Sequence, residues 1–188
     1  MAEEHKHRAD KKGNVAVKFI VRLARFLAFQ YLFQKRNLRY IATLKGKNAI
    51  EKRIQGSKIC LDLRDEGISK DLALDGIREP VSTNFIKKEI KKGDTVIDIG
   101  ANIGYYALLE SRLAGNDGKI YAIEPILENV NALKRNIRLN NYSNIEVFQM
   151  AIGEKSKIEK MHITSYSNWH SFVNHGQKII GSRDIKIS

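Results

Sequence analysis

A short apolar run that ends in two closely spaced glycines constrains this chain more than any other feature. The run is residues 96–99, Val-Ile-Asp-Ile, and it breaks at Gly100 and Gly104. Clustered β-branched residues are typical of a buried parallel strand, and the glycines predict a tight turn into a helix over residues 105–114. This order predicts a ligand site, because glycine allows close backbone approach and the start of a helix offers unpaired N–H donors.

The spacing of the glycines helps to choose between ligand classes. A dinucleotide site uses G-x-G-x-x-G, in which the middle glycine makes room for a pyrophosphate. Here Asn102 holds that middle position, and the pattern from Asp98 is acid-x-Gly-x-x-x-Gly. This pattern resembles the first motif of S-adenosylmethionine-dependent methyltransferases. A second predicted strand ends at Glu124, 20 residues after Gly104, which is the separation expected of a carboxylate that binds ribose.

The net charge of +12 is concentrated toward the N-terminus. Residues 1–60 carry 15 Lys and Arg against 4 Asp and Glu, whereas the remaining residues carry 18 against 17. A groove for nucleic acid needs positive charge beside the site. The nearly neutral region around the glycine turn therefore argues against a nucleic-acid partner.

The basic residues belong to a predicted N-terminal helical arm, residues 1–47. A long helix is expected over residues 15–40, and residues 1–14 are expected to be frayed. The longest uncharged run in this helix has nine residues, 26–34, whereas crossing a membrane takes ~20. One hypothesis is a basic amphipathic helix that lies on an anionic membrane surface or on a partner. The alternative is a helix packed on its own domain with its cationic face in water.

Residues 48–188 predict one α/β domain, and its first part leads into the glycine turn. A hairpin is expected over residues 48–63, followed by an irregular stretch over residues 64–78. A helix capped by Ser82 or Thr83 comes next. The side chains expected to face inward from that helix are Phe85, Ile86 and Ile90.

The second part of this domain alternates strands and helices, which predicts parallel pairing with right-handed crossovers. The elements expected after the first strand cover residues 105–114, 119–124, 127–139 and 145–150. Two further strands, over residues 158–163 and 184–188, flank a polar loop. A doubly wound sheet pairs its first strand with one from later in the chain, and no such strand follows here. The first strand is therefore expected to keep an unpaired apolar edge, which indicates an incomplete domain or a partner chain that covers the edge.

Several blocks of the sequence together resemble the FkbM-type methyltransferases. The blocks are residues 76–81, 92–105, 122–125 and 150–153, and the most specific part is Asp-Ile-Gly-Ala-Asn-Ile-Gly. The resemblance covers residues 65–188. It implies a Rossmann-like class I methyltransferase fold, a three-layer α/β sandwich, here truncated at its C-terminal side. It also implies transfer of a methyl group from S-adenosylmethionine to an oxygen, often of a sugar hydroxyl, so that the partner is a small-molecule or glycan acceptor.

The same resemblance implies which residues contact the cofactor. They are Glu79, Asp98, Gly100, Ala101, Asn102, Gly104, Glu124 and Ala151. Asp98 would fix the loop and the amino group of the cofactor, Glu124 would accept both ribose hydroxyls, and Ala151 would meet the adenine. No catalytic residue is assigned, because such sequences continue into an acid-x-acid-Gly motif that does not occur here.

Neither the histidines nor the cysteine predict a further reactive site. His170 and His175 lie five residues apart without a nearby cysteine, which is a poor pattern for a metal, so none is expected. Cys60 is the only cysteine, and its place in an alternating strand indicates a small apolar core residue. The lone cysteine and a charged N-terminus predict a cytoplasmic location, with membrane association through residues 15–40 as an addition.

The predicted function is that of an S-adenosylmethionine-dependent methyltransferase. One alternative is a non-catalytic or membrane-peripheral module that keeps only the cofactor-binding half. The other alternative is a dinucleotide-dependent oxidoreductase, against which Asn102 counts. The sequence assigns no oligomeric state.

Overall fold

The computed structural model describes residues 20–36, 38, 40, 46–176 and 178–188. The chain divides into two units, residues 1–45 and 46–188. In the first unit, residues 20–36 are helical, as predicted, while residues 1–19 lie outside the described part. None of the described helices combines the length and the hydropathy that a membrane span needs. Membrane contact by this helix stays a prediction.

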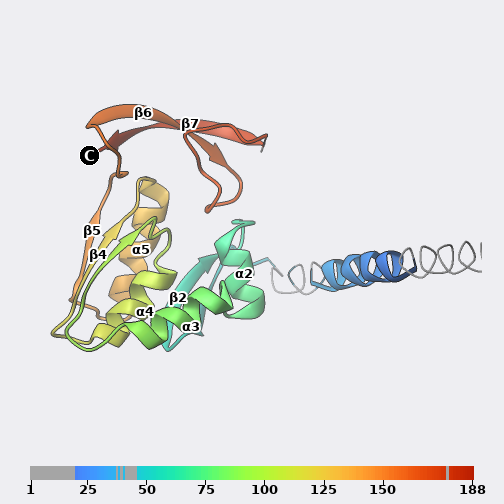
Figure 1. Ribbon diagram of the computed structural model, residues 1–188, viewed down its shortest axis with the longest axis horizontal. Helices are drawn as coiled ribbons and strands as arrows, with labels where there is room; N and C mark the ends of the chain where they lie inside the picture. Colours follow the sequence, from blue (N-terminus) through green and yellow to red (C-terminus); the bar gives the residue numbers. More distant parts are fainter. Residues whose placement is uncertain (1–19, 37, 39, 41–45, 177) are drawn as a thin grey trace, which may run out of the picture. The chain divides into compact units, whose positions relative to one another are not determined.

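The centre of the second unit is a parallel sheet of three strands in the order β3-β4-β5. The helices α4 and α5 connect the strands and lie on the same side of the sheet (Figure 1). In chain order, these elements are β3 (Thr95–Ile99), α4 (Tyr105–Ala114), β4 (Lys119–Ile123), α5 (Leu127–Leu139) and β5 (Ile145–Phe148). The predicted alternation and parallel pairing are confirmed, and β5 ends two residues earlier than expected.

Small side chains allow the helices to pack closely on the sheet. Ala107 and Ala114 of α4 contact Ile120 and Ala122 of β4, and Leu133 of α5 joins the same cluster. All five side chains are fully buried. Burial of this apolar surface, at roughly 25 cal/mol per Å², fixes α4 and therefore the glycine turn that precedes it.

The predicted hairpin is confirmed as β1 (Ala49–Ile54) and β2 (Ser57–Asp62), paired antiparallel. Two asparagines, Asn136 of α5 and the C-cap residue Asn140, bind the backbone of β2. The Asn136 Oδ1 accepts from the Cys60 N–H at 2.9 Å, and Asn140 exchanges two hydrogen bonds of 2.7 Å with the Lys58 backbone. Asn136 also donates to the carbonyl oxygen of Ile103 at 2.9 Å. The hairpin is thus held on the helical layer and tied to the glycine turn.

The stretch expected to be irregular contains a helix, α2 (Ile68–Asp75), so that expectation was wrong. Ile68 and Leu72 lie four residues apart and pack in the core beside Ile59 and Leu61 of β2. Contact with the hairpin stabilises this helix. The sequence did not predict it, because charged residues interrupt the short apolar stripe.

The next helix, α3 (Pro80–Glu89), differs from the prediction at its start and on its faces. Its N-cap is Glu79, not Ser82 or Thr83, because proline favours the first helical turn. Thr83 lies inside the helix, where its hydroxyl donates to the carbonyl oxygen of Arg78 at 2.6 Å. Phe85 was expected to face inward but is 62% exposed. Ile86 and Ile90, which were also expected to face inward, are half-buried.

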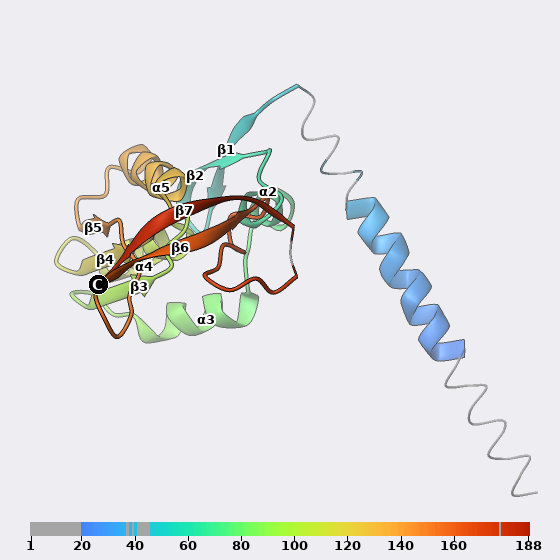
Figure 2. The ribbon, with the colours of Figure 1, turned by 90° about the horizontal axis from the view of Figure 1, so that it is seen from above.

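The two further strands form an antiparallel hairpin, β6 (Lys157–Thr164) and β7 (Ile179–Ile187). Both predicted strands exist, but β7 begins at Ile179, five residues before the expected start. A parallel bridge between Ala151 and Ile187 joins it to the chain that follows β5. Figure 2 shows the two strands crossing the unit toward α2. The polar loop between them therefore reaches residues from the beginning of the domain.

The edge of the sheet at β3 is open, as predicted. Among the described strands, β3 pairs with β4 alone. Ile97 and Ile99 are 62% and 65% exposed on the face opposite the helices. The resemblance implied three layers, of which the described residues form two, the sheet and one helical layer. The β1–β2 hairpin packs on the helical layer.

Two carboxyl groups lie buried where β3 meets α4. The Asp98 side chain accepts a hydrogen bond from the Ala107 backbone, and burial raises the Asp98 pKa to about 6. Burial and, second, the charge of Asp98 raise the pKa of Glu110 to about 8. One oxygen of each group has no hydrogen-bond partner within the described ranges. Ionisation of these groups therefore destabilises the folded state.

We expect Glu110→Gln to weaken the dependence of stability on pH. The native state holds a proton on Glu110 up to about pH 8, whereas the unfolded group ionises near its ordinary pKa of 4.5. The native state binds more protons between these values, so the free energy of unfolding falls as pH rises, by at most about 1.4 kcal/mol per unit. Urea unfolding at about pH 5.5 and about pH 8, followed by circular dichroism, measures this slope.

The control is Glu146→Gln, which changes an exposed carboxylate paired with Lys119 at 3.2 Å. This variant should keep the slope of the parent protein. A Glu110→Gln protein with the parent slope would show that the Glu110 carboxyl is not held protonated by the fold.

We expect Gly104→Ala to destabilise the domain more than Gly93→Ala does. Both glycines have positive φ, +97° and +86°, so alanine strains the backbone at each by about 1–3 kcal/mol. At Gly104 an added Cβ would lie 2.5 Å from Leu133 Cδ1, whereas at Gly93 it meets no atom within 4 Å. Overpacking against α5 should add about 1–3 kcal/mol. Equal losses in thermal or urea unfolding would contradict the close packing.

Candidate functional site

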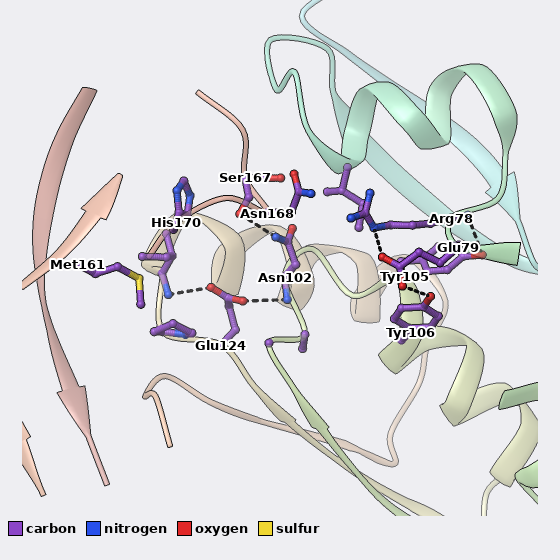
Figure 3. Close-up of a pocket in the computed structure, with 15 residues that line it drawn as sticks. Arg78, Glu79, Asn102, Tyr105, Tyr106, Glu124, Met161, Ser167, Asn168 and His170 are labelled. Carbon is purple, nitrogen blue, oxygen red and sulfur yellow. Dashed lines mark hydrogen bonds and ion pairs between the residues drawn. The ribbon is translucent and has the colours of Figure 1, made fainter. Parts of the chain in front are cut away.

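A cavity of about 290 Å³ opens where β3 and β4 end, beside the start of α4. This is near the lower end of the volumes found for ligand pockets, roughly 300–1,000 Å³. Its walls come from several parts of the second unit (Figure 3). They are the glycine turn with α4, the segment after β4, the start of α2, the approach to α3, and the β6–β7 hairpin with its loop.

The carboxylate of Glu124 joins the two strand ends. Its Oε2 accepts a hydrogen bond of 2.9 Å from the backbone N–H of Asn102, in the glycine turn. Glu124 follows β4, and the turn follows the neighbouring parallel strand β3. Figure 3 shows the Glu124 side chain directed at Asn102. The sequence predicted that these residues meet, and the structure brings them together.

The remaining acceptor sites of Glu124 are largely occupied. Its Oε1 accepts from the backbone of Ile126 at 2.9 Å and from the Asn129 amide at 3.2 Å. A carboxylate offers about four acceptor positions, so about one is left for a ligand. The two ribose hydrogen bonds implied by the resemblance require that a protein contact be shared or given up. Burial raises the Glu124 pKa, and the three hydrogen bonds oppose that shift.

The glycine turn leaves space at the bottom of the pocket. Gly100 has φ +85°, and a Cβ built on it would meet no atom within 4 Å. Asn102 also has a positive φ, +50°. Its side-chain oxygen accepts from the backbone of Ile103 at 2.8 Å, and its amide donates to the carbonyl oxygen of Ser167 at 2.9 Å. Asn102 is thus oriented at both ends of its amide.

A second wall is formed by Arg78 and Glu79, which are anchored to α4. The buried hydroxyl of Tyr105 accepts from the Arg78 backbone at 3.2 Å, and the Tyr106 hydroxyl donates to Glu79 Oε2 at 3.2 Å. Glu79 also pairs with the Arg78 guanidinium at 3.3 Å. Its φ of +43° is unusual for a residue other than glycine, and such strain is often found at functional positions.

The third wall is formed by residues 165–170, which we call the roof loop. Ser167, Asn168 and His170 of this loop line the cavity, together with Met161 of β6. The Asn168 Oδ1 is buried and has no hydrogen-bond partner among the residues that the structure describes. His170 Nδ1 accepts from the Thr164 backbone at 3.2 Å, and burial lowers the His170 pKa.

The cavity gathers five of the eight residues implied by the resemblance. They are Glu79, Gly100, Ala101, Asn102 and Glu124. Three others lie outside its lining. Asp98 is buried against α4, Gly104 packs on Leu133, and Ala151 bonds with the backbone of β7.

The roof loop contributes the residues that sequence reasoning did not assign to this site. Ser167 follows Asn102 by 65 residues, and nothing in the local spacing indicates that they meet. His170 was considered as a metal ligand, and no cluster of three or more metal-binding side chains occurs in the described ranges. The only local signal is the polar composition of the loop itself.

The residues present fit a nucleoside with a positive charge. The lining holds two carboxylates, Glu79 and Glu124, against the guanidinium of Arg78. Glu124 is an acceptor for hydroxyl or amino groups of a ligand. The open space at Gly100 admits a ligand close to the backbone.

Similar proteins are found for parts of this chain. A 59-residue segment is 39% identical to protein-L-isoaspartate O-methyltransferase of Methanococcoides burtonii and covers 31% of this chain and 29% of that protein. The enzyme of the same name from Fervidobacterium nodosum is 35% identical over 83 residues, 42% of each chain. The chain therefore matches less than half of the length of these two relatives.

A solved structure gives a similarly local match. A "SAM dependent methyltransferase" from Aquifex aeolicus is 31% identical over the aligned part, with a TM-score of 0.33. The alignment covers 38% of this chain and 37% of that one.

A family model matches a larger part of the chain, residues 76–183, and its description is "Vibrio cholerae RfbT protein". The matched range includes the glycine turn, Glu124 and the roof loop. The chain belongs to the family of the Vibrio cholerae RfbT protein.

Proposed function

We propose that residues 46–188 bind S-adenosylmethionine in the cavity and serve the transfer of its methyl group to a hydroxyl oxygen. The observation that carries the proposal is the hydrogen bond between the Glu124 carboxylate and the Asn102 backbone. It places a buried acceptor beside a glycine turn at the ends of neighbouring parallel strands, where α/β sheets bind ligands. The matched segments of the isoaspartate methyltransferases support the same function.

Each wall of the cavity has a role in this proposal. When bound, S-adenosylmethionine supplies an electrophilic methyl group on a positively charged sulfur. Glu124 accepts a hydrogen bond from a ribose hydroxyl, and Gly100 leaves room for the ligand next to the backbone. The carboxylates of Glu79 and Glu124 favour the positive charge. The roof loop orients Asn102 through the carbonyl oxygen of Ser167.

Methyl transfer requires little of the protein beyond positioning the acceptor oxygen and the methyl group. The acceptor oxygen bonds to the methyl carbon as the carbon–sulfur bond breaks, and the products are a methyl ether, S-adenosylhomocysteine and a proton. The FkbM-type resemblance favours a sugar or another small-molecule hydroxyl as the acceptor. The names of the two relatives instead point to a protein carboxylate.

The geometry of Asn102 argues against a dinucleotide. Its side-chain amide bonds to Ser167 and stands where the middle glycine of a dinucleotide motif would admit a pyrophosphate. The oxidoreductase alternative is therefore less favoured than methyl transfer.

We expect Glu124→Gln to weaken the binding of S-adenosylhomocysteine by about ten- to a hundredfold. The substitution keeps the size of the side chain but removes its charge and one acceptor oxygen, and hydrogen bonds to charged groups contribute about 1.5–3 kcal/mol. Isothermal titration calorimetry with S-adenosylhomocysteine measures the affinity, and NAD should not displace this ligand.

The matched control is Glu128→Gln, four residues further along. Glu128 is exposed and pairs with Arg183 at 3.1 Å outside the cavity, so its replacement should leave the affinity unchanged. Equal affinity of the Glu124→Gln and parent proteins, or preferential binding of NAD, would contradict the proposal.

The acceptor class requires a separate measurement. With S-adenosylmethionine labelled in its methyl group, we expect label in a neutral saccharide and none in a peptide that contains isoaspartate. Labelling of the peptide alone would show that the acceptor is a carboxylate and not a sugar hydroxyl. The cofactor proposal would then still stand.

A further inference from the structure

The roof loop is held in place by a carboxylate that does not line the cavity. Asp65 lies between β2 and α2. Its Oδ1 accepts from the backbone N–H of Ser167 at 3.0 Å, and its Oδ2 accepts from the Ser167 hydroxyl at 2.9 Å. These bonds connect residues that are 102 positions apart in the sequence. They fix the loop on the α2 side of the cavity.

The same carboxylate is itself fixed by α2. It accepts from the N–H of Gly67 at 2.8 Å and from the N–H of Ser69 at 2.9 Å. All of its roughly four acceptor positions are therefore used. Asp65 cannot rotate without breaking bonds to two chain segments, so it holds the loop and α2 in one arrangement.

On its other side, Ser167 contacts Asn102, a predicted cofactor residue, and Asn129 of α5. Its carbonyl oxygen accepts from the Asn102 amide at 2.9 Å and from the Asn129 amide at 3.4 Å. Asn129 in turn donates to Glu124. A continuous series of hydrogen bonds thus runs from Asp65 through Ser167 to the turn and to the Glu124 carboxylate.

The absence of a side chain at Gly67 allows this close approach. A Cβ at this position would lie 2.9 Å from the backbone nitrogen of Ser167 and closer still to the Asn168 amide oxygen. Gly67 has a negative φ of −90°, so positive φ is not the reason for glycine here. Its size is what the contact requires.

We propose that Asp65 is a positioning residue that latches the roof loop over the cavity and thereby sets the affinity for the nucleoside. It acts through Ser167, which orients Asn102 and Asn129. The inference rests on the proposed function, because the ligand is the nucleoside proposed above. It adds a residue, distant in sequence, on which the shape of the site depends.

Trp169 provides a direct probe of the loop. It is the only tryptophan of the chain, it belongs to the roof loop, and it stacks on Tyr166 with ring centroids 4.8 Å apart. Its fluorescence anisotropy and its quenching by acrylamide therefore report on this loop and on no other part of the protein.

The test compares Asp65→Asn, Ser167→Ala and the double variant of the full chain. We expect S-adenosylhomocysteine to bind about tenfold more weakly to Asp65→Asn and about three- to tenfold more weakly to Ser167→Ala. The double variant should lose less than the product of the two, because both changes break one contact. Quenching of Trp169 should increase in each, and Ser167→Thr, which keeps the hydroxyl, should restore both properties.

Two controls separate the latch from general effects. Ser165→Ala removes another hydroxyl of the same loop, and Asp62→Asn removes a nearby carboxylate that pairs with Arg64 at the surface. Neither should change the affinity or the quenching. If Asp65→Asn does not fold because α2 loses its bonds, Ser167→Ala alone decides the question.

The outcomes distinguish the latch from the proposed function. A parent protein that does not bind S-adenosylhomocysteine would reject the proposed function and with it the effect of the latch on affinity. A parent that binds, together with Asp65→Asn and Ser167→Ala variants of parental affinity and quenching, would overturn the latch and leave the proposed function standing.

Discussion

The buried carboxylate of Glu124 is the contact on which the candidate site depends. Removing a carboxylate from water is costly unless hydrogen bonds replace its hydration. Glu124 receives three, from the glycine turn, from the start of α5 and from Asn129. Because one donor lies in the glycine turn and two lie at the start of α5, the carboxylate fixes the position of the turn relative to α5. The same group lines the cavity and keeps about one acceptor position.

The core is arranged to hold the glycine turn in place beneath this carboxylate. Alanines of α4 pack on β4, and Gly104 approaches Leu133 so closely that a methyl group would clash. Asn136, fully buried, binds both the β2 edge and the carbonyl oxygen of Ile103. The glycine turn is therefore fixed by α5 as well as by its own strand and helix. Gly104 packs on Leu133, and its contact with the cofactor stays a prediction.

Two features of the second unit work against its stability. Asp98 and Glu110 bury carboxyl oxygens that lack partners in the described part of the chain, and burial raises the pKa of both. Ile97 and Ile99 lie exposed on a sheet whose edge strand has one neighbour among the described strands. An open apolar edge is a surface that proteins usually cover.

The sequence by itself determined the strand, the glycine turn and the bounds of α4 and α5, because local spacing of apolar residues and glycines encodes these elements. It also placed Glu124 beside the turn, since parallel strands end at one edge of a sheet. It did not determine the helix α2, the Glu79 cap of α3 or the exposure of Phe85. Only the tertiary structure decided the roof of the cavity. Ser167 contacts Asn102 and Asp65, which are 65 and 102 residues away in the sequence. These contacts depend on how the β6–β7 hairpin packs on the rest of the domain, and local sequence patterns do not determine that packing.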